Sequence, residues 1–166
     1  MNKKVLFIVH AAVIAALYVV LTLLANALGL ANYAVQVRFS EALTVLPFFT
    51  PAAIPGLCIG CLLSNILTGC ALPDIIFGTL ATLIGAVCTY LLRRNKWLAP
   101  LPPIAANTLI VPFVLRYAYG IEPLWLSFLT VGAGEIISCG ILGLLLLNVL
   151  NQYKRYIFPA GNEAKK

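Results

Sequence analysis

The sequence predicts an all-α integral membrane protein, a bundle of six transmembrane helices. The first observation is composition: 62% of the 166 residues are hydrophobic and only 10% are charged, with a mean hydropathy of +1.01. Soluble globular domains do not reach such values. The second observation is a succession of six apolar stretches, separated by Gly, Pro, Asn or charged residues. They cover residues 5–28, 38–50, 52–68, 74–92, 100–117 and 123–150, which we interpret as a single membrane domain over residues 1–166.

The third observation is the placement of charge. The formal net charge is +6, but the basic residues form short clusters between apolar stretches with few aromatic residues among them. Nucleic-acid-binding surfaces usually combine basic and aromatic side chains over one face. A membrane surface is therefore the expected partner of these charges, and we expect no nucleic acid.

The first apolar stretch follows Lys3 and Lys4 and runs from Val5 to Ala25, a length of 21 residues. That is longer than the apolar core of a signal peptide and long enough to span about 30 Å of hydrocarbon. We interpret it as a retained transmembrane helix.

The second and third stretches are short and contain prolines. Pro47, Pro51 and Pro55 each remove a backbone donor that a continuous helix would need. The region is either two short helices or one broken span. Arg38 and Glu41 are three residues apart at its start, a spacing that also suits an ordinary intrahelical ion pair.

The connection after the fourth stretch carries Arg93, Arg94 and Lys96, and it decides the number of crossings. Basic loop residues prefer the cytoplasm. Five crossings would place this cluster outside, whereas six crossings leave only Arg38 and Arg116 there. We therefore expect six helices with both termini in the cytoplasm. The cytoplasmic face would then hold nine basic residues: Lys3, Lys4, Arg93, Arg94, Lys96, Lys154, Arg155, Lys165 and Lys166.

Small residues repeat every four positions on two helices. Gly56, Gly60 and Ser64 share one face of the third stretch. Such faces let helix backbones approach closely, within the chain or against another subunit. The first stretch carries two similar alanine pairs, which are candidates for either kind of contact: Ala11 with Ala15, and Ala12 with Ala16.

Three acidic residues lie in or next to the apolar stretches: Glu41, Asp74 and Glu135. Ionisable side chains inside a membrane are costly and usually face a cavity or the bundle interior. Asp74 follows Pro73 at a helix start, where it could simply complement the helix dipole. Glu135 lies about 18 Å along the last helix, too deep for such a role. These acids are the best pointers to function.

Amide side chains accompany the acids. Asn107 lies about 15 Å inside the fifth stretch, at a depth similar to that of Glu135. Asn65 and Tyr33 could complete the walls of one cavity that opens outward, with Phe77 and Trp125 as stacking candidates. Carboxylate and amide acceptors suit a small, flat ligand that is rich in donors or cationic.

Neither a metal site nor a catalytic site is evident. Cys58 and Cys61 have the spacing of a zinc or redox pair, but no second pair exists and the one histidine, His10, is distant. The sequence contains no phosphate-binding loop and no nucleophile turn. We expect no cofactor, no metal and no enzyme. The alternatives are a membrane enzyme that uses Asp74 and Glu135 as acid and base, and a purely structural subunit.

Four segments in succession resemble the QueT family of queuosine-precursor transporters. The most specific is Arg38-Phe-Ser-Glu-Ala-Leu-Thr44 within Val37–Pro47. Ile54–Gly60, Asp74–Thr82 and Gly134–Cys139 follow in the same order, so that the resemblance covers nearly the whole chain.

This resemblance implies the S-component of an energy-coupling factor (ECF) importer, a six-helix substrate-binding subunit with both termini in the cytoplasm. It also implies partners: a transmembrane scaffold and two ATPases, which hydrolyse the ATP. Such subunits contact the scaffold through small residues of the first helix. The matching positions are Ala11, Ala12, Ala15 and Ala16.

The implied ligand is a 7-deazaguanine. Its ring offers an N–H and an amine side by side, a donor pair that one carboxylate accepts with two charge-assisted hydrogen bonds. Glu135 or Glu41 could accept that pair, Asp74 could meet an aminomethyl cation, and Asn107 or Asn65 could meet the ring carbonyl. Riboflavin, thiamine, folate and biotin are the alternative ligands. The expected ligand-binding residues are Tyr33, Arg38, Glu41, Asn65, Asp74, Asn107 and Glu135.

Overall fold

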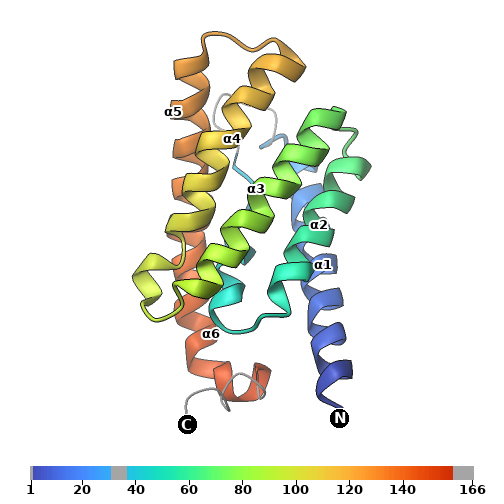
Figure 1. Ribbon diagram of the computed structural model, residues 1–166, viewed down its shortest axis with the longest axis vertical. Coiled ribbons are helices and arrows are strands. Elements are labelled where there is room, and N and C mark those ends of the chain that lie inside the picture. The colour runs from blue at the N-terminus through green and yellow to red at the C-terminus, as the bar shows by residue number, and fades with distance from the viewer. Residues whose placement is uncertain (1, 31–36, 159–166) are drawn as a thin grey trace.

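Every regular element in the computed structural model is helical in the part of the chain that it describes, residues 2–30 and 37–158 (Figure 1). Tyr33 lies outside the described residues. The elements are α1 (Lys3–Ala27), the 3₁₀ helix η1 (Phe39–Phe48), α2 (Ala53–Leu67), α3 (Leu72–Leu91), η2 (Lys96–Leu98), α4 (Leu101–Tyr119), α5 (Leu124–Glu135), the π-helix η3 (Ile136–Leu142) and α6 (Gly143–Ile157).

Four helical stretches are long and apolar enough to cross a bilayer. They are Lys3–Ala27, Leu72–Leu91, Lys96–Tyr119 and Leu124–Lys154. The prediction of an α-helical membrane protein is therefore confirmed. The last stretch is one continuous helix in which α5 passes through η3 into α6.

The region with three prolines forms two separate short helices, η1 and α2. The range 38–50, which we expected to be a transmembrane helix, contains instead ten residues of 3₁₀ helix with Pro47 inside it. A proline ring cannot supply the N–H that a regular α-helix needs at that position. Of the two alternatives for this region, the structure shows two short helices. The segment 38–50 is a 3₁₀ helix instead of the regular α-helix that its range suggested, while α2 takes up most of the range 52–68.

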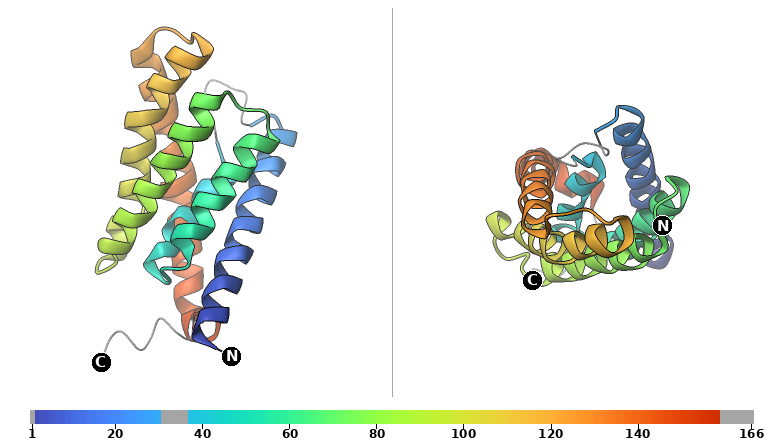
Figure 2. Two further views of the ribbon diagram at one scale, coloured as in Figure 1. Left: turned by 45° about the vertical axis from the view of Figure 1, so that its right-hand side comes forward. Right: turned by 90° about the horizontal axis from the view of Figure 1, so that it is seen from above.

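The 3₁₀ helix lies in the centre of the bundle. In the view from above in Figure 2, η1 is surrounded by the longer helices, and it contacts α1, α2, α3, α6 and η3. All its residues from Ser40 to Pro47 are buried. This short helix therefore places Ser40 and Glu41 in the interior of the bundle.

Small residues join α1 to α2. A Cβ atom on Gly56 would lie 2.7 Å from the backbone oxygen of Ala11, and one on Gly60 would lie 3.0 Å from that of Ala15. The glycine face of α2 therefore packs inside this chain, as small-residue faces do. Ala12 and Ala16 remain on the exposed side of α1.

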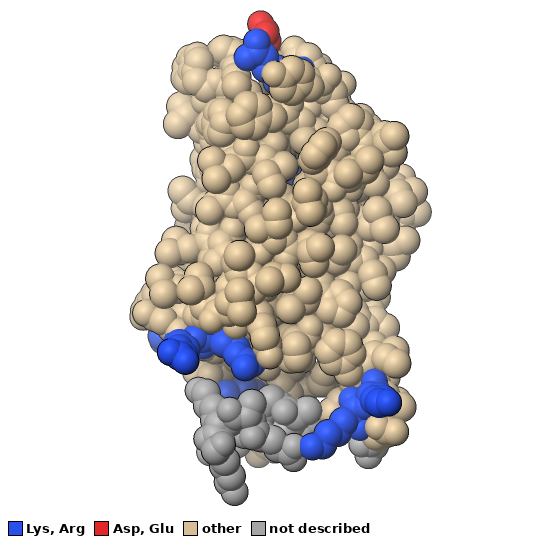
Figure 3. Space-filling view, in the orientation of Figure 1, with Lys and Arg blue, Asp and Glu red and all other residues tan. Residues whose placement is uncertain are grey.

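Charged side chains lie at the two ends of the molecule, and the surface between them is almost free of charge in the view of Figure 3. We call the end at which α1 begins and α6 ends the basic end (Figure 1). Arg93 and Arg94, which follow α3, and Lys96 of η2 also lie there. The opposite end, the far end, holds the ion pair between Arg116 and Glu122, whose N and O atoms are 3.5 Å apart.

Candidate functional site

Three buried polar side chains from three elements meet inside the bundle: Glu41 of η1, Asn107 of α4 and Glu135 at the end of α5. We call them the inner cluster. The Asn107 amide nitrogen donates to Glu135 Oε1 at 3.1 Å and to Glu41 Oε2 at 3.4 Å. One amide group thus joins two carboxyl groups that are far apart in sequence.

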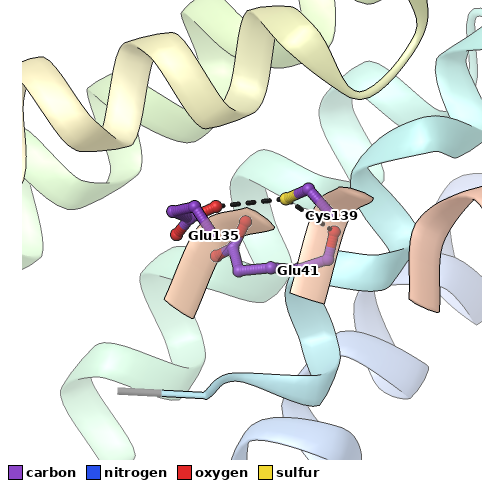
Figure 4. Close-up of side chains that lie close together, drawn as sticks. All are labelled: Glu41, Glu135 and Cys139. Atoms are coloured by element: carbon purple, nitrogen blue, oxygen red, sulfur yellow. Dashed lines mark hydrogen bonds between the residues drawn. The ribbon is translucent and has the colours of Figure 1, made fainter. Parts of the chain in front are cut away.

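Two further donors hold these carboxyl groups. The Tyr18 hydroxyl of α1 donates to Glu41 Oε1, and the Cys139 thiol donates to Glu135 Oε2 at 3.1 Å. The sulfur of Cys139 is also 3.3 Å from the backbone oxygen of Glu41, as Figure 4 shows. Buried carboxyl groups need such partners because an unpaired one is costly in an apolar interior. The cluster is therefore fixed in place by α1, η1, α4 and the last long helix.

Arg38 lies between two cavities. The small cavity, of about 10 Å³, adjoins the inner cluster. The large cavity, of about 340 Å³, lies at the far end. Arg38 contributes to the walls of both. Within residues 2–30 and 37–158, no ion pair joins Arg38 to Glu41, so their three-residue spacing does not form the simple intrahelical pair that it also permits.

The large cavity lies where the far-end termini of four helices meet. Its polar walls include Asp74 of α3, Asn65 of α2 and Tyr119 of α4. Its volume falls within the range of about 300–1,000 Å³ typical of small-molecule sites. Exposed residues such as Asn26 and Tyr119 form part of its wall, so it reaches the surface.

A model of the family described as QueT transporter matches residues 8–152, from α1 to α6. The chain belongs to the QueT transporter family. It is also 38% identical over 83 residues to a curated relative, the queuosine precursor transporter QueT of Lactococcus lactis subsp. cremoris (strain MG1363). That match covers 50% of this chain and 48% of the relative, about half of its length. No solved structure matches the chain.

Membership in the QueT transporter family, together with four long apolar helices, makes the chain a multi-pass protein of the cell membrane. The family is described as one of transporters. The polar groups of the two cavities are the candidate groups for recognising a small molecule.

The structure distributes the expected ligand-binding residues of this QueT family member over the two cavities. Glu41, Asn107 and Glu135 line the small one, whereas Asn65 and Asp74 line the large one. The two aromatic candidates for stacking line neither cavity: Phe77 is 47% exposed and Trp125 is 63% exposed on the outer surface.

Three residues near the cavities were not expected from the sequence: Tyr18, Tyr119 and Cys139. Cys139 lies four residues after Glu135 and so shares its helix face, a signal that was available. Tyr18 lies three residues after Ala15 on the face of α1 that packs against α2, but nothing local shows that its hydroxyl would reach η1.

Glu41, Glu135 and Cys139 are the described residues that could together hold a metal ion, with their ligand atoms within 4.8 Å of one another. The set combines a soft thiol with two hard carboxylates, which favour different metals. All three groups are already engaged in hydrogen bonds with the protein. A metal ion would therefore have to displace these hydrogen bonds.

Proposed function

We propose that this chain is the substrate-binding subunit of an ECF-type importer and that it binds a queuosine precursor, a 7-deazaguanine. Family membership supports transport, and the printed name of the Lactococcus relative supports the class of ligand. The observation that carries the proposal is the inner cluster, in which two buried carboxyl groups face a cavity inside the bundle. At about 10 Å³ this cavity has room for one water, so we propose that it opens towards the large cavity when the ring binds.

The inner cluster suits the donor edge of a deazaguanine. A carboxylate can accept the ring N–H and the exocyclic amine together, in two parallel charge-assisted hydrogen bonds. The Asn107 amide nitrogen already donates a hydrogen bond to one oxygen of each carboxyl group. The donor edge of a ligand would form hydrogen bonds of the same kind. We propose that the ligand competes for these oxygens and that Asn107 then turns towards the ring carbonyl. Sites built from such groups strongly reject analogues that lack the donors.

The charge distribution supports an orientation of the chain in the membrane. We propose six crossings with both termini in the cytoplasm, because the basic end carries Lys3, Lys4 and the cluster from Arg93 to Lys96. The far end, with the large cavity, then faces outward and admits the ligand from outside the cell.

A transmembrane scaffold and two ATPases would supply the power for import. We propose that α1 contacts the scaffold. Ala12 and Ala16 are exposed there, whereas the backbones of Ala11 and Ala15 are already covered by α2. Ala16→Leu is therefore expected to reduce uptake by cells and to leave ligand binding to the isolated chain unchanged.

Isothermal titration of the purified chain in detergent tests the ligand. We expect 7-aminomethyl-7-deazaguanine and 7-cyano-7-deazaguanine to bind at micromolar concentrations or below. Failure of both, while riboflavin, thiamine, folate or biotin binds, would show that the ligand is wrong and that the binding role is right. If none of these compounds binds, the binding role itself is contradicted.

Glu135→Gln tests the site. It keeps the shape of the side chain but turns one acceptor oxygen into a donor, so that the paired donors of the ligand lose their partner. We expect an affinity loss of at least about tenfold, the effect of about 1.4 kcal/mol. Glu122→Gln is the matched control, since its carboxylate is exposed beside Arg116. Wild-type binding by Glu135→Gln would favour a structural role for the inner cluster.

A further inference from the structure

The large cavity at the far end contains an acidic group whose local partners leave one oxygen free. We propose that this cavity is the subsite for a cationic substituent on the ligand ring and that Asp74 Oδ1 accepts its hydrogen bond. The proposal rests on the proposed function, and it divides the ligand between two cavities: the ring at the inner cluster, the amine at Asp74.

Asp74 is buried, with 4% of its surface exposed, yet its Oδ1 atom has no hydrogen-bond partner among residues 2–30 and 37–158. Nearly all buried polar atoms in proteins are paired, so each exception calls for an explanation. Asp74 lines the large cavity, and the free oxygen is therefore available to a donor that enters it.

The other carboxyl oxygen of Asp74 is held in place. The Tyr119 hydroxyl accepts from the backbone N–H of Ala71 at 2.9 Å and donates to Asp74 Oδ2 at 3.2 Å. Since the Ala71 donor occupies the oxygen of Tyr119, the single hydroxyl proton is directed to Asp74. Tyr119 is thus a positioning residue that fixes the carboxyl group and leaves Oδ1 free.

One face of α3 connects the two cavities. Asp74, Gly78 and Thr82 follow at four-residue spacing, which places them in line along one side of the helix. Asp74 lines the large cavity, while Gly78 and Thr82 line the small one. A Cβ atom on Gly78 would lie 3.3 Å from both Asp74 Oδ1 and Asn65 Nδ2. The free oxygen therefore points to the junction of the two cavities.

The large cavity is lined by one carboxyl group, Asp74, and one guanidinium group, Arg38, so its charges balance. The selectivity for a cation therefore rests on the free Oδ1 atom of Asp74 and not on an excess of acidic groups. A primary amine carries three donors and a positive charge, which match a free, buried carboxylate oxygen. A nitrile carries neither.

A pair of ligands that differ only at this substituent tests the subsite. Asp74→Asn is titrated with the 7-aminomethyl and the 7-cyano form, and its melting temperature is compared with that of the unchanged chain. We expect at least a tenfold loss of affinity for the aminomethyl form and less than a twofold change for the cyano form. Equal losses for both ligands, or no loss for either, would overturn the subsite.

Tyr119→Phe is the second variant, because it keeps the charge of Asp74 and removes the hydroxyl that positions it, together with the acceptor of the Ala71 N–H. We expect a twofold to fivefold loss, again for the aminomethyl form alone. If the unchanged chain binds the cyano form but not the aminomethyl form, the subsite is wrong and the proposed function stands. If it binds neither form, the proposed function fails and the subsite fails with it.

Discussion

Two glycine-bearing helix faces in this molecule show opposite uses of the same residue. On α2, Gly56 and Gly60 face α1 so closely that a Cβ on either would lie 2.7 Å from an atom of that helix. On α3, Gly78 faces the junction of two cavities, where a Cβ would meet only the ends of two polar side chains at 3.3 Å. The first face removes space between helices, and the second leaves space at the junction of the two cavities, where we propose that a ligand binds.

The two regions differ in what they are expected to contribute: the contact between α1 and α2 to the stability of the bundle, and the surroundings of the cavities to the proposed binding of a ligand. The contact between α1 and α2 is backbone against small residues, and neither Gly56 nor Gly60 lines either of the two cavities. The region around η1, α3 and α4 contains buried acids and amides that a membrane interior tolerates only when they are paired. Substitutions in the contact between α1 and α2 are therefore expected to lower the melting temperature, whereas substitutions around the cavities are expected to lower the affinity for the ligand.

Gly56→Leu is expected to have the largest effect on stability. A Cβ there would lie 2.7 Å from the backbone oxygen of Ala11, which cannot rotate away, so the two helices must separate. Overpacking of this kind costs about 1–3 kcal/mol and sometimes more. Thermal unfolding in detergent measures the loss. Gly140→Leu is the control, since the nearest atoms to its Cβ lie at 3.8 Å. Equal melting temperatures for the two variants would disprove close packing of α1 on α2.

Asn107→Ala is expected to have an intermediate effect on stability and a strong one on binding. It removes the amide that donates to both carboxyl groups of the inner cluster. Leaving buried acceptors without a donor costs about 1–3 kcal/mol. Thermal unfolding and titration with 7-aminomethyl-7-deazaguanine measure the two effects. Asn148→Ala, at an exposed position beside Lys96, should change neither. Unaltered binding by Asn107→Ala would exclude the inner cluster from the ligand site.

Arg116→Ala is expected to have the smallest effect. Its ion pair with Glu122 is exposed at the far end, where water and salt screen the attraction. Exposed pairs contribute about 0–1 kcal/mol. We expect a change in melting temperature within experimental error and unchanged ligand affinity. A large drop in either would mean that the far-end connection between α4 and α5 supports the cavity more than the structure suggests.

Much of the fold could be predicted from the sequence because lipid imposes simple rules. The long helices α1, α3 and α4 end within two residues of the expected ranges. The region from Arg38 to Pro55 could not be decided, because prolines exclude a regular helix without specifying what replaces it. A buried 3₁₀ helix is an outcome of packing, and local sequence does not encode it.

The candidate site was only partly predictable. Ionisable side chains inside a membrane carry a high free-energy cost, and this rule drew attention to Glu41, Asp74 and Glu135. All three are buried beside cavities. Their division between two cavities depends on where η1 and α3 pack. The roles of Tyr18 and Tyr119 depend on contacts across 23 and 45 residues of sequence, which no local pattern reveals.

The central claim is tested most directly by measuring Gly60→Ala and Gly78→Ala side by side, for melting temperature and for affinity towards 7-aminomethyl-7-deazaguanine. Both substitutions gain the same helix propensity, so that differences between them report the surroundings of the new methyl group. We predict that Gly60→Ala melts at a lower temperature than Gly78→Ala and binds like the unchanged chain, whereas Gly78→Ala keeps its stability and loses at least tenfold in affinity. Weakened binding in Gly60→Ala with intact binding in Gly78→Ala would contradict the assignment of the two faces.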